Sequence, residues 1–346
     1  MENNKTSVCV IIFIAIVLLF SCNKNKNNLY SVSVSPYSMI GTPAEMFSLG
    51  QIRIFQANNN LICSLMENLS LDSSVTNYTI APMHLIYNIL ADSISTDWQK
   101  GFAKHYNLTE LSNKQFQQSE TAFLNIVKDI DSSINIESSI YDKNDSSINI
   151  VQHFEIKLIY QDVAPNNVDN IFTTINNKKP RLDFITINGN IRSLTTSEEQ
   201  VVELPIGNGN YMLMLIRPKL KSIREYMLDF SEEKYFSFIK DLQERRNTVS
   251  FPLISIKGTL SNIPMPQYSR MDSVIHFSPK LNLIHSFVLK KVAKTDINIQ
   301  KVSTFTDGAF SFNNSDIIKY SSPFLFIIRG KNSNLIIFVG IYCDYK

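Results

Sequence analysis

The C-terminal stretch of the chain constrains its fold most strongly. Residues 321–345 contain two apolar runs, Phe324–Ile328 and Leu335–Ile341, on either side of the polar turn Arg329–Asn334. Both runs are rich in Phe, Ile and Val, are shorter than a typical helix and end at turn residues. This pattern predicts two strands that are buried on both faces and joined as a core hairpin.

Length and charge exclude several classes of protein. The 346 residues are enough for one large domain or two smaller ones, and enough to bury a sizeable core. The 33 basic and 31 acidic residues leave a net charge of +2, and Lys and Arg are scattered along the chain. Because no basic stripe is interleaved with aromatic residues, we expect no nucleic-acid partner.

The N-terminus predicts an exported lipoprotein. Lys5 precedes the apolar run Val8–Phe20, which is too short to span a bilayer comfortably. The run ends in Leu-Phe-Ser-Cys at residues 19–22, which resembles the lipobox of bacterial lipoproteins. The small Ser21 suits cleavage, and the thiol of Cys22 would carry the lipid. A plain signal peptide, or an anchor helix with an incidental cysteine, is the alternative.

This N-terminus also sets the expected organisation and location. Residues 1–22 are expected to be the signal peptide, residues 23–50 a flexible polar tether, and residues 51–346 a single domain. The mature chain would be held by its lipid in a bacterial envelope membrane, facing either the periplasm or the cell surface.

The remaining cysteines and the histidines predict no chemistry. Once Cys9 leaves with the signal peptide and Cys22 carries lipid, Cys63 and Cys343 remain. An oxidising compartment permits a disulfide between them, but both lie in apolar runs, which favours two buried free thiols. No metal-binding spacing, H-E-x-x-H motif or G-x-S-x-G motif is found. We therefore expect no metal, no cofactor and no enzymatic activity.

An ordered series of segments resembles the serpin family of serine protease inhibitors. The C-terminal residues read P-F-L-F-x-I-R, a polar turn and L-I-x-F-x-G, as at the C-terminal end of serpins. In the family, the histidine that matches His285 is structural. The upstream segments that resemble the family in the same order are a helix at Asn58–Leu69, Asn77–Pro82 opening a buried helix through Leu90, a strand at Ile134–Tyr141, strand, turn and strand at Val201–Pro218, a helix from Ser231 that ends at Arg245-Arg246, a strand at Thr248–Gly258, and the strand at Ile284-His285.

The chain departs from the family pattern in two places. The serines that lie beside and after the proline in serpins, in the shutter under the central sheet, are here Ala81, His84 and Ile86. Phe154–Val163 is expected to continue as a short helix and a strand, but the stretch from there to Val201 is short and polar. Serpins carry a strand and a covering helix in this region. The central sheet is therefore expected either to lack them or to build them from other residues.

The resemblance implies both a fold and a function. The expected fold is α+β, with several helices packed on three mostly antiparallel β-sheets and an exposed reactive loop at about residues 292–320. In serpins this loop is bait for a protease, and measuring back from Pro323 places the scissile bond near Phe312–Asn313. A recognised Phe312 implies a target with a chymotrypsin-like apolar pocket. The implied protein is a monomeric inhibitor of serine or cysteine proteases.

The hinge of the loop favours an alternative function. The cleaved loop of an inhibitory serpin inserts as a new strand into the central sheet, and its hinge in family inhibitors reads G-T followed by a run of Ala. Here both the Gly and the Ala run are missing, and burying an unpartnered Asp296 would be costly. The alternative is a non-inhibitory binding or structural lipoprotein with a serpin fold. The candidate hinge residues, by alignment from either end of the loop, are Thr295, Asp296, Asn298 and Ile299.

Overall fold

A computed structural model gives the arrangement of the chain. It describes residues 49–72, 76–90, 97–109, 134–143, 147–160, 170–206, 209–264, 268–269, 276–277, 280–293 and 317–345. The chain forms two compact units, Met1–Met46 and Phe47–Lys346, and all the described residues belong to the second unit.

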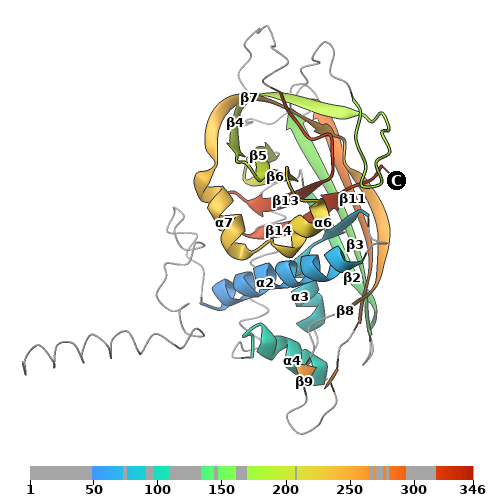
Figure 1. Ribbon diagram of the computed structural model, residues 1–346. Coiled ribbons are helices and arrows are strands. Elements are labelled where there is room, and N and C mark those ends of the chain that lie inside the picture. Colours follow the sequence, from blue (N-terminus) through green and yellow to red (C-terminus); the bar gives the residue numbers. More distant parts are fainter. Residues whose placement is uncertain are drawn as a thin grey trace, which may run out of the picture. The chain divides into compact units, whose positions relative to one another are not determined.

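The described helices precede or interrupt the strands rather than alternate with them (Figure 1). They are α2 (Leu49–Leu71), α3 (Pro82–Leu90), α4 (Asp97–His105), α6 (Ile223–Leu228) and α7 (Glu232–Asp241). Helix α2 begins well before the expected Asn58. The apolar pattern did not show its first turns, since Asn58 and Asn59 are buried polar residues that interrupt the apolar stripe. The amide Nδ2 of Asn58 donates to the carbonyl oxygen of Ile336 at 3.1 Å, whereas Oδ1 is buried without a partner among the described residues.

The described strands form a four-stranded sheet, an eight-stranded sheet and a two-stranded ribbon. The four-stranded sheet has the order β2 (Ile134–Lys143), β3 (Ser147–Tyr160), β11 (Lys280–Ala293) and β8 (Ser255–Pro264). The eight-stranded sheet has the order β1 (Tyr78–Ile80), β14 (Ile336–Tyr342), β13 (Phe324–Gly330), β6 (Tyr211–Pro218), β5 (Glu199–Ile206), β4 (Phe184–Thr195), β7 (Gln243–Pro252) and β12 (Ile317–Lys319). The ribbon pairs β9 (Tyr268–Ser269) with β10 (His276–Phe277). All these pairs are antiparallel except β3 with β11 and β7 with β12.

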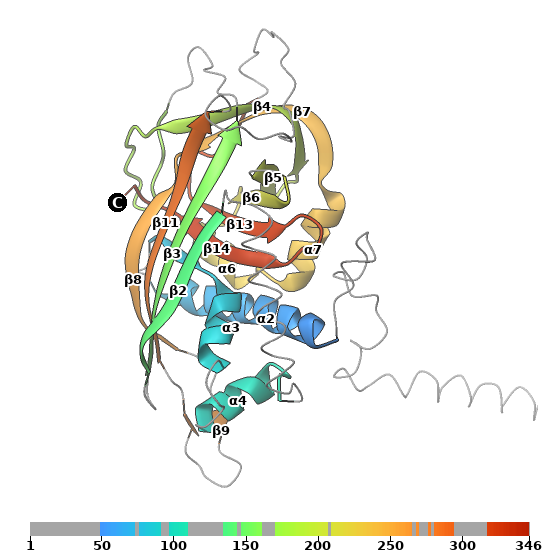
Figure 2. The same ribbon diagram turned by 180° about the vertical axis from the view of Figure 1, so that it is seen from behind.

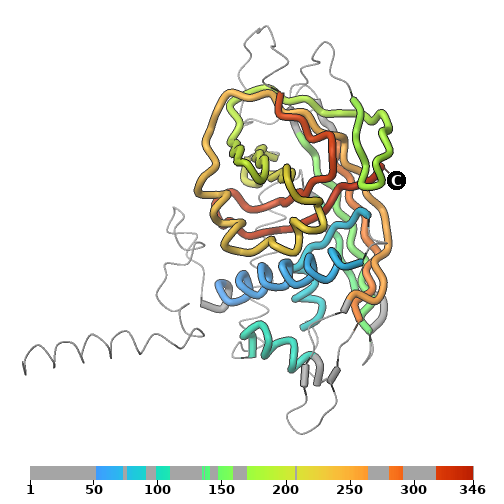
Figure 3. The backbone as a smooth tube through the Cα atoms, in the orientation of Figure 1, coloured from blue at the N-terminus to red at the C-terminus, as the bar shows by residue number. Residues whose placement is uncertain are grey.

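The predicted C-terminal hairpin is confirmed as the centre of the core. Every residue of β13 and β14 is buried, and β13 also pairs with β6, so these distant segments lie side by side (Figure 3). Its aromatic rings contact the four-stranded sheet: Phe338 stacks on Phe154 of β3 with ring centroids 5.2 Å apart, and Phe326 lies 5.1 Å from Phe287 of β11. The hairpin therefore joins the two larger sheets.

The segment expected to contain a short helix is instead a single long strand. Strand β3 follows β2 after a short connection and fills the place beside β11, so the sheet builds this strand from residues 147–160 (Figure 2). Its even-numbered residues point inward over eleven positions, a period of two that excludes a helix. The inward residues are Ile148, Ile150, Gln152, Phe154, Ile156 and Leu158.

Two other expected boundaries are wrong. Helix α7 is capped by Ser231 as predicted but ends at Asp241, and Arg245 and Arg246 lie in β7. The expected strand Thr248–Gly258 is divided between β7 and β8, which belong to different sheets. The division falls just after Pro252, which has no N–H to donate to a ladder.

Candidate functional site

The candidate site is the line along which two parallel strands meet. Strand β11 pairs with β3 from Lys280 opposite Ser147 to Ala293 opposite Tyr160, which is the whole 14-residue length of both strands. We call this pairing the seam. It is the one parallel pair among the described strands of the four-stranded sheet. A strand that reversed direction after Ala293 and entered the seam would run antiparallel to both neighbours, which is the more stable pairing.

Buried side chains from both strands of the seam contact one short segment, Thr79–Ala81. Gln152 of β3 is 1% exposed; its Oε1 accepts from the Ala81 amide at 3.0 Å, and its Nε2 donates to the Ala81 carbonyl at 3.1 Å. His285 of β11 is the register partner of Gln152, and its Nδ1 lies 3.4 Å from Oγ1 of Thr79. Because both anchors lie in the same segment, the strands cannot separate without breaking at least one of these contacts.

The amide of Gln152 also connects the seam to β2 and α3. Its Nε2 donates to Oγ of Ser138 at 3.3 Å, and the same oxygen accepts from Nδ2 of Asn88 at 3.0 Å. Ala81, His84 and Ile86, which stand where serpins have serines, are all buried, and Gln152 bonds to the backbone of the first of them. The sequence analysis missed Gln152, although a lone polar residue among the inward-facing apolar residues of β3 was a signal for it.

Burial controls the charge of His285. The residue is 1% exposed, and desolvation lowers the pKa of its imidazole to about 4. The ring is therefore neutral near pH 7, with one N–H and one acceptor nitrogen. His285 matches the structural role implied by the family resemblance.

The outer face of the seam carries a second set of contacts, which we call the outer clasp. One pair is an ion pair, in which Nζ of Lys290 lies 2.7 Å from Oε2 of Glu155 and, by its hydrogen bond, lowers the pKa of that carboxyl. The other two pairs are hydrogen bonds. The outer clasp consists of Asn282 with Asn149 at 2.8 Å, Ser286 with His153 at 2.5 Å, and Lys290 with Glu155.

Other kinds of site find no support in the described part of the chain. The described residues contain no group of three or more His, Cys, Asp or Glu that could hold a metal ion. Cys63 and Cys343 are free thiols, and burial raises the pKa of each to about 12, which makes them unreactive. Among the same residues, no helix has both the length and the apolar character needed to cross a membrane.

The residues predicted to contact a protease lie outside the described residues. Phe312, Asn313, the hinge residues Thr295, Asp296, Asn298 and Ile299, and the lipidation residue Cys22 all fall in this part of the chain. The described residues that flank the loop are Ala293 at the end of β11 and Ile317 at the start of β12, which belong to different sheets.

Comparison with known proteins identifies the family. A family model described as serpin (serine protease inhibitor) matches residues 153–345, which include part of β3, all of β11 and the C-terminal hairpin. The chain has the α+β fold of the protease-inhibitor type. It belongs to the serpin family. A comparison with curated protein sequences gives no match.

Solved serpin structures share the fold at low sequence identity. Native protease nexin-1 with heparin superposes with a TM-score of 0.63 at 10% identity, covering 85% of this chain and 100% of that chain. SRPN18 from Anopheles gambiae gives 0.60 at 11% identity, with 85% and 98% covered. Tengpin, a thermophilic serpin in its native state, gives 0.57 at 14% identity, with 85% and 94% covered. The expected serpin-like α+β fold is confirmed.

Proposed function

We propose that the protein is a monomeric, lipid-anchored serpin that inhibits a serine or cysteine protease and is not itself an enzyme. Residues 292–320 would serve as bait, with cleavage near Phe312–Asn313 by a protease that has a chymotrypsin-like apolar pocket. The seam is the observation that carries this proposal, because a parallel pair can accept one antiparallel strand and β11 leads directly into the loop.

The lengths of the two segments are compatible with insertion. The stretch 294–312, which cleavage would leave attached to β11, is longer than either 14-residue strand of the seam. Once inserted, it would gain ladder hydrogen bonds on both edges. Opposing this gain are the contacts at Gln152 and His285, the outer clasp, and the burial of Asp296. The balance between these terms decides whether a protease is trapped or merely cleaves the loop.

Trapping is tested by titrating the full chain with chymotrypsin. We expect a covalent complex that survives a denaturing gel, and a melting temperature of the cleaved chain that is higher by more than about 10 °C. Phe312→Ala should abolish the complex, whereas the matched variant Phe310→Ala should retain it. Cleavage near Phe312 with neither a complex nor a rise in melting temperature would contradict inhibition, and a binding scaffold would then be the function.

The lipid anchor is tested separately in cells. Cys22→Ala should prevent lipidation and release soluble protein, and globomycin should block maturation of the unaltered chain. Cys9→Ala, a change within the apolar run of the signal peptide, is the matched control and should leave anchoring intact. If the Cys22 variant stays in the membrane fraction and globomycin has no effect, the N-terminus is not a lipoprotein signal.

A further inference from the structure

Strand β7 changes character halfway along its length. Its last residues, Thr248–Pro252, are all buried, whereas Gln243, Glu244, Arg245 and Arg246 are all exposed. Successive residues of a strand point to opposite faces, so this first half of β7 is open to solvent on both faces. Along it, the ladder partner among the described strands is β4 (Figure 1). The exposed half of β7 therefore offers two rows of side chains to a partner.

Two adjacent arginines dominate the charge of this exposed half. Nη2 of Arg245 donates to Oε1 of Gln243 on the same face at 2.7 Å, and Arg246 therefore points to the opposite face. The one carboxylate among residues 243–247 belongs to Glu244, which is further along the strand from β12 than either arginine. Guanidinium groups bind carboxylates in a bidentate manner, and Arg is enriched in the hot spots of interfaces. This surface therefore fits an acidic partner.

The register of β12 places the arginines near the proposed scissile bond. Strand β12 runs parallel to β7, with Ile317 opposite Thr248, so the chain enters β12 at the end of the sheet where the arginines lie. At about 3.3 Å per residue, Arg246 and Arg245 lie about 7 and 10 Å along β7 from Thr248. Because Asn313 precedes Ile317 by only four positions, chain length alone keeps it within about 14 Å of the start of β12.

Strand β12 is held firmly enough to fix this geometry. Nη1 of Arg217 in β6 donates to the carbonyl oxygen of Lys319, the last residue of β12. The next residue, Tyr320, is buried; its amide donates to the carbonyl oxygen of Ser250 at 2.8 Å, and its hydroxyl donates to that of Leu215 at 2.9 Å. The end of the bait loop that follows the scissile bond is therefore attached at a defined place beside β7.

A protease bound at Phe312–Asn313 would cover the arginines. A stable protein interface buries about 800 Å² on each partner, which is a patch about 16 Å in radius. We propose that Arg245 and Arg246 contact the target protease and select one that carries carboxylates beside its cleft, on the side that binds the residues after the scissile bond. This role rests on the proposed inhibitory function, and it adds a charge requirement to the apolar pocket of the target.

The test compares two forms of one protease. Chymotrypsin and succinylated chymotrypsin, in which lysine ammonium groups are replaced by carboxylates, share the apolar pocket but differ in surface charge. The rate constant for attack on the loop of the full chain is measured with each, counting covalent complex and simply cleaved chain together. Each form is normalised by its rate on a small peptide substrate. At about 0.05 M salt the succinylated form should attack about tenfold faster, and the difference should shrink at about 0.5 M salt.

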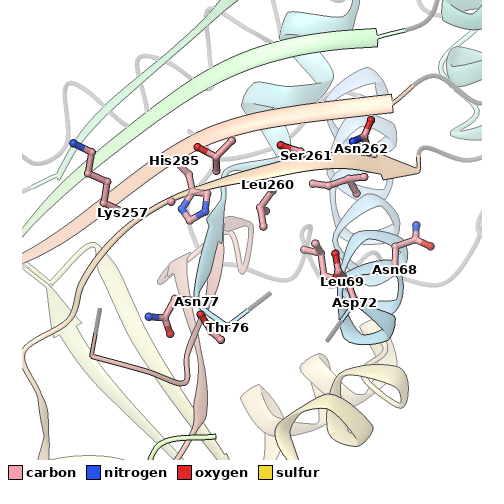
Figure 4. A pocket seen from close by; sticks show the side chains of 13 residues that line it. Asn68, Leu69, Asp72, Thr76, Asn77, Lys257, Leu260, Ser261, Asn262 and His285 are labelled. Carbon is pink, nitrogen blue, oxygen red and sulfur yellow. The ribbon is translucent and has the colours of Figure 1, made fainter. Parts of the chain in front are cut away.

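Arg245→Glu combined with Arg246→Glu should lower the rate with the succinylated form about tenfold or more at low salt. The matched control is Lys178→Glu with Lys257→Glu, which changes the total charge equally at two exposed lysines. Lys257 lies on β8 in the other large sheet, beside a polar pocket (Figure 4). The control should change the rate less than about twofold. Arg245→Lys with Arg246→Lys keeps both charges and should retain most of the rate.

Two results would overturn the proposal. Equal slowing by the two double variants would mean that overall charge steers the protease, and a loss that persists undiminished at high salt would mean that the arginines do not act through their charge. If neither form attacks the loop, the bait and this inference fail together. Failure of the proposed function alone is distinguishable, because attack would then depend on the arginines but yield only cleaved chain and no covalent complex.

Discussion

Replacing Glu203 by Gln should lower the free energy of unfolding by about 3–5 kcal/mol. Glu203 of β5 is fully buried, and Arg329 of β13 is 1% exposed at its side chain. The Oε1 atom of Glu203 accepts from Nε of Arg329 at 2.7 Å and lies 2.6 Å from its Nη2, while Oε2 pairs with Arg192. The substitution keeps the shape of the side chain but leaves the Arg329 guanidinium buried without its countercharge.

The expected loss is large because Arg329 also holds the turn of the central hairpin. Its Nη1 donates to the carbonyl oxygens of Gly330 and Lys331, each at 3.0 Å, and to Oδ1 of Asn334 at 2.7 Å. The backbone oxygen of Asn334 in turn accepts from the hydroxyl of Tyr235 in α7 at 2.7 Å. One carboxylate therefore supports a network that joins β5, the hairpin and α7.

Urea unfolding of the unaltered chain and the variant measures this effect. The matched control is Asp229→Asn, because the Lys221–Asp229 ion pair is about half exposed at both side chains and should contribute nothing measurable. A loss below about 1 kcal/mol for Glu203→Gln would show that the buried pair does not stabilise the fold.

The sequence predicted the hairpin but not the role of its arginine. Two runs of buried β-forming residues identify the strands without any long-range information. Arg329, by contrast, lies at the edge of a polar turn, where a charged residue is usually solvated. Its partner Glu203 is 126 positions away in the sequence, so the reason for its burial exists only in the folded chain.

The pairing of the two strands of the seam also could not be predicted from the sequence. The strand character of β2 and of the segment around His285 follows from local pattern, whereas Phe154–Val163, which the family resemblance led us to expect as a short helix and a strand, lies up to Tyr160 in β3. That β3 lies parallel to β11 cannot be read from either segment alone, since parallel pairing joins strands that are distant in sequence. The hydrogen bonds of Gln152 to Ala81 likewise join segments that are 71 positions apart in the sequence.

Gln152→Leu should lower the free energy of unfolding by about 1–3 kcal/mol. Leu suits the apolar neighbours of β3 in size, but it cannot accept from the buried amide of Ala81, for which Gln152 Oε1 is the hydrogen-bond acceptor found in the described part of the chain. Urea unfolding measures the loss. Glu155→Gln, which weakens a partly exposed pair of the outer clasp, is the control and should cost less than about 1 kcal/mol. Equal losses in the two variants would mean that the buried contact of Gln152 with Ala81 is no stronger than the Glu155–Lys290 pair of the outer clasp.

The same variant separates stability from function. If Gln152 and His285 hold the seam closed, removing the amide of Gln152 destabilises the closed native state. It thereby lowers the barrier to separating β3 from β11. Gln152→Leu should then form a larger fraction of covalent complex with chymotrypsin, at the expense of simple loop cleavage, than the unaltered chain. An unchanged or smaller fraction would place the barrier elsewhere. The predicted hinge residue Asp296 would then be the next to replace, because the cost of burying its charge on insertion would not depend on Gln152.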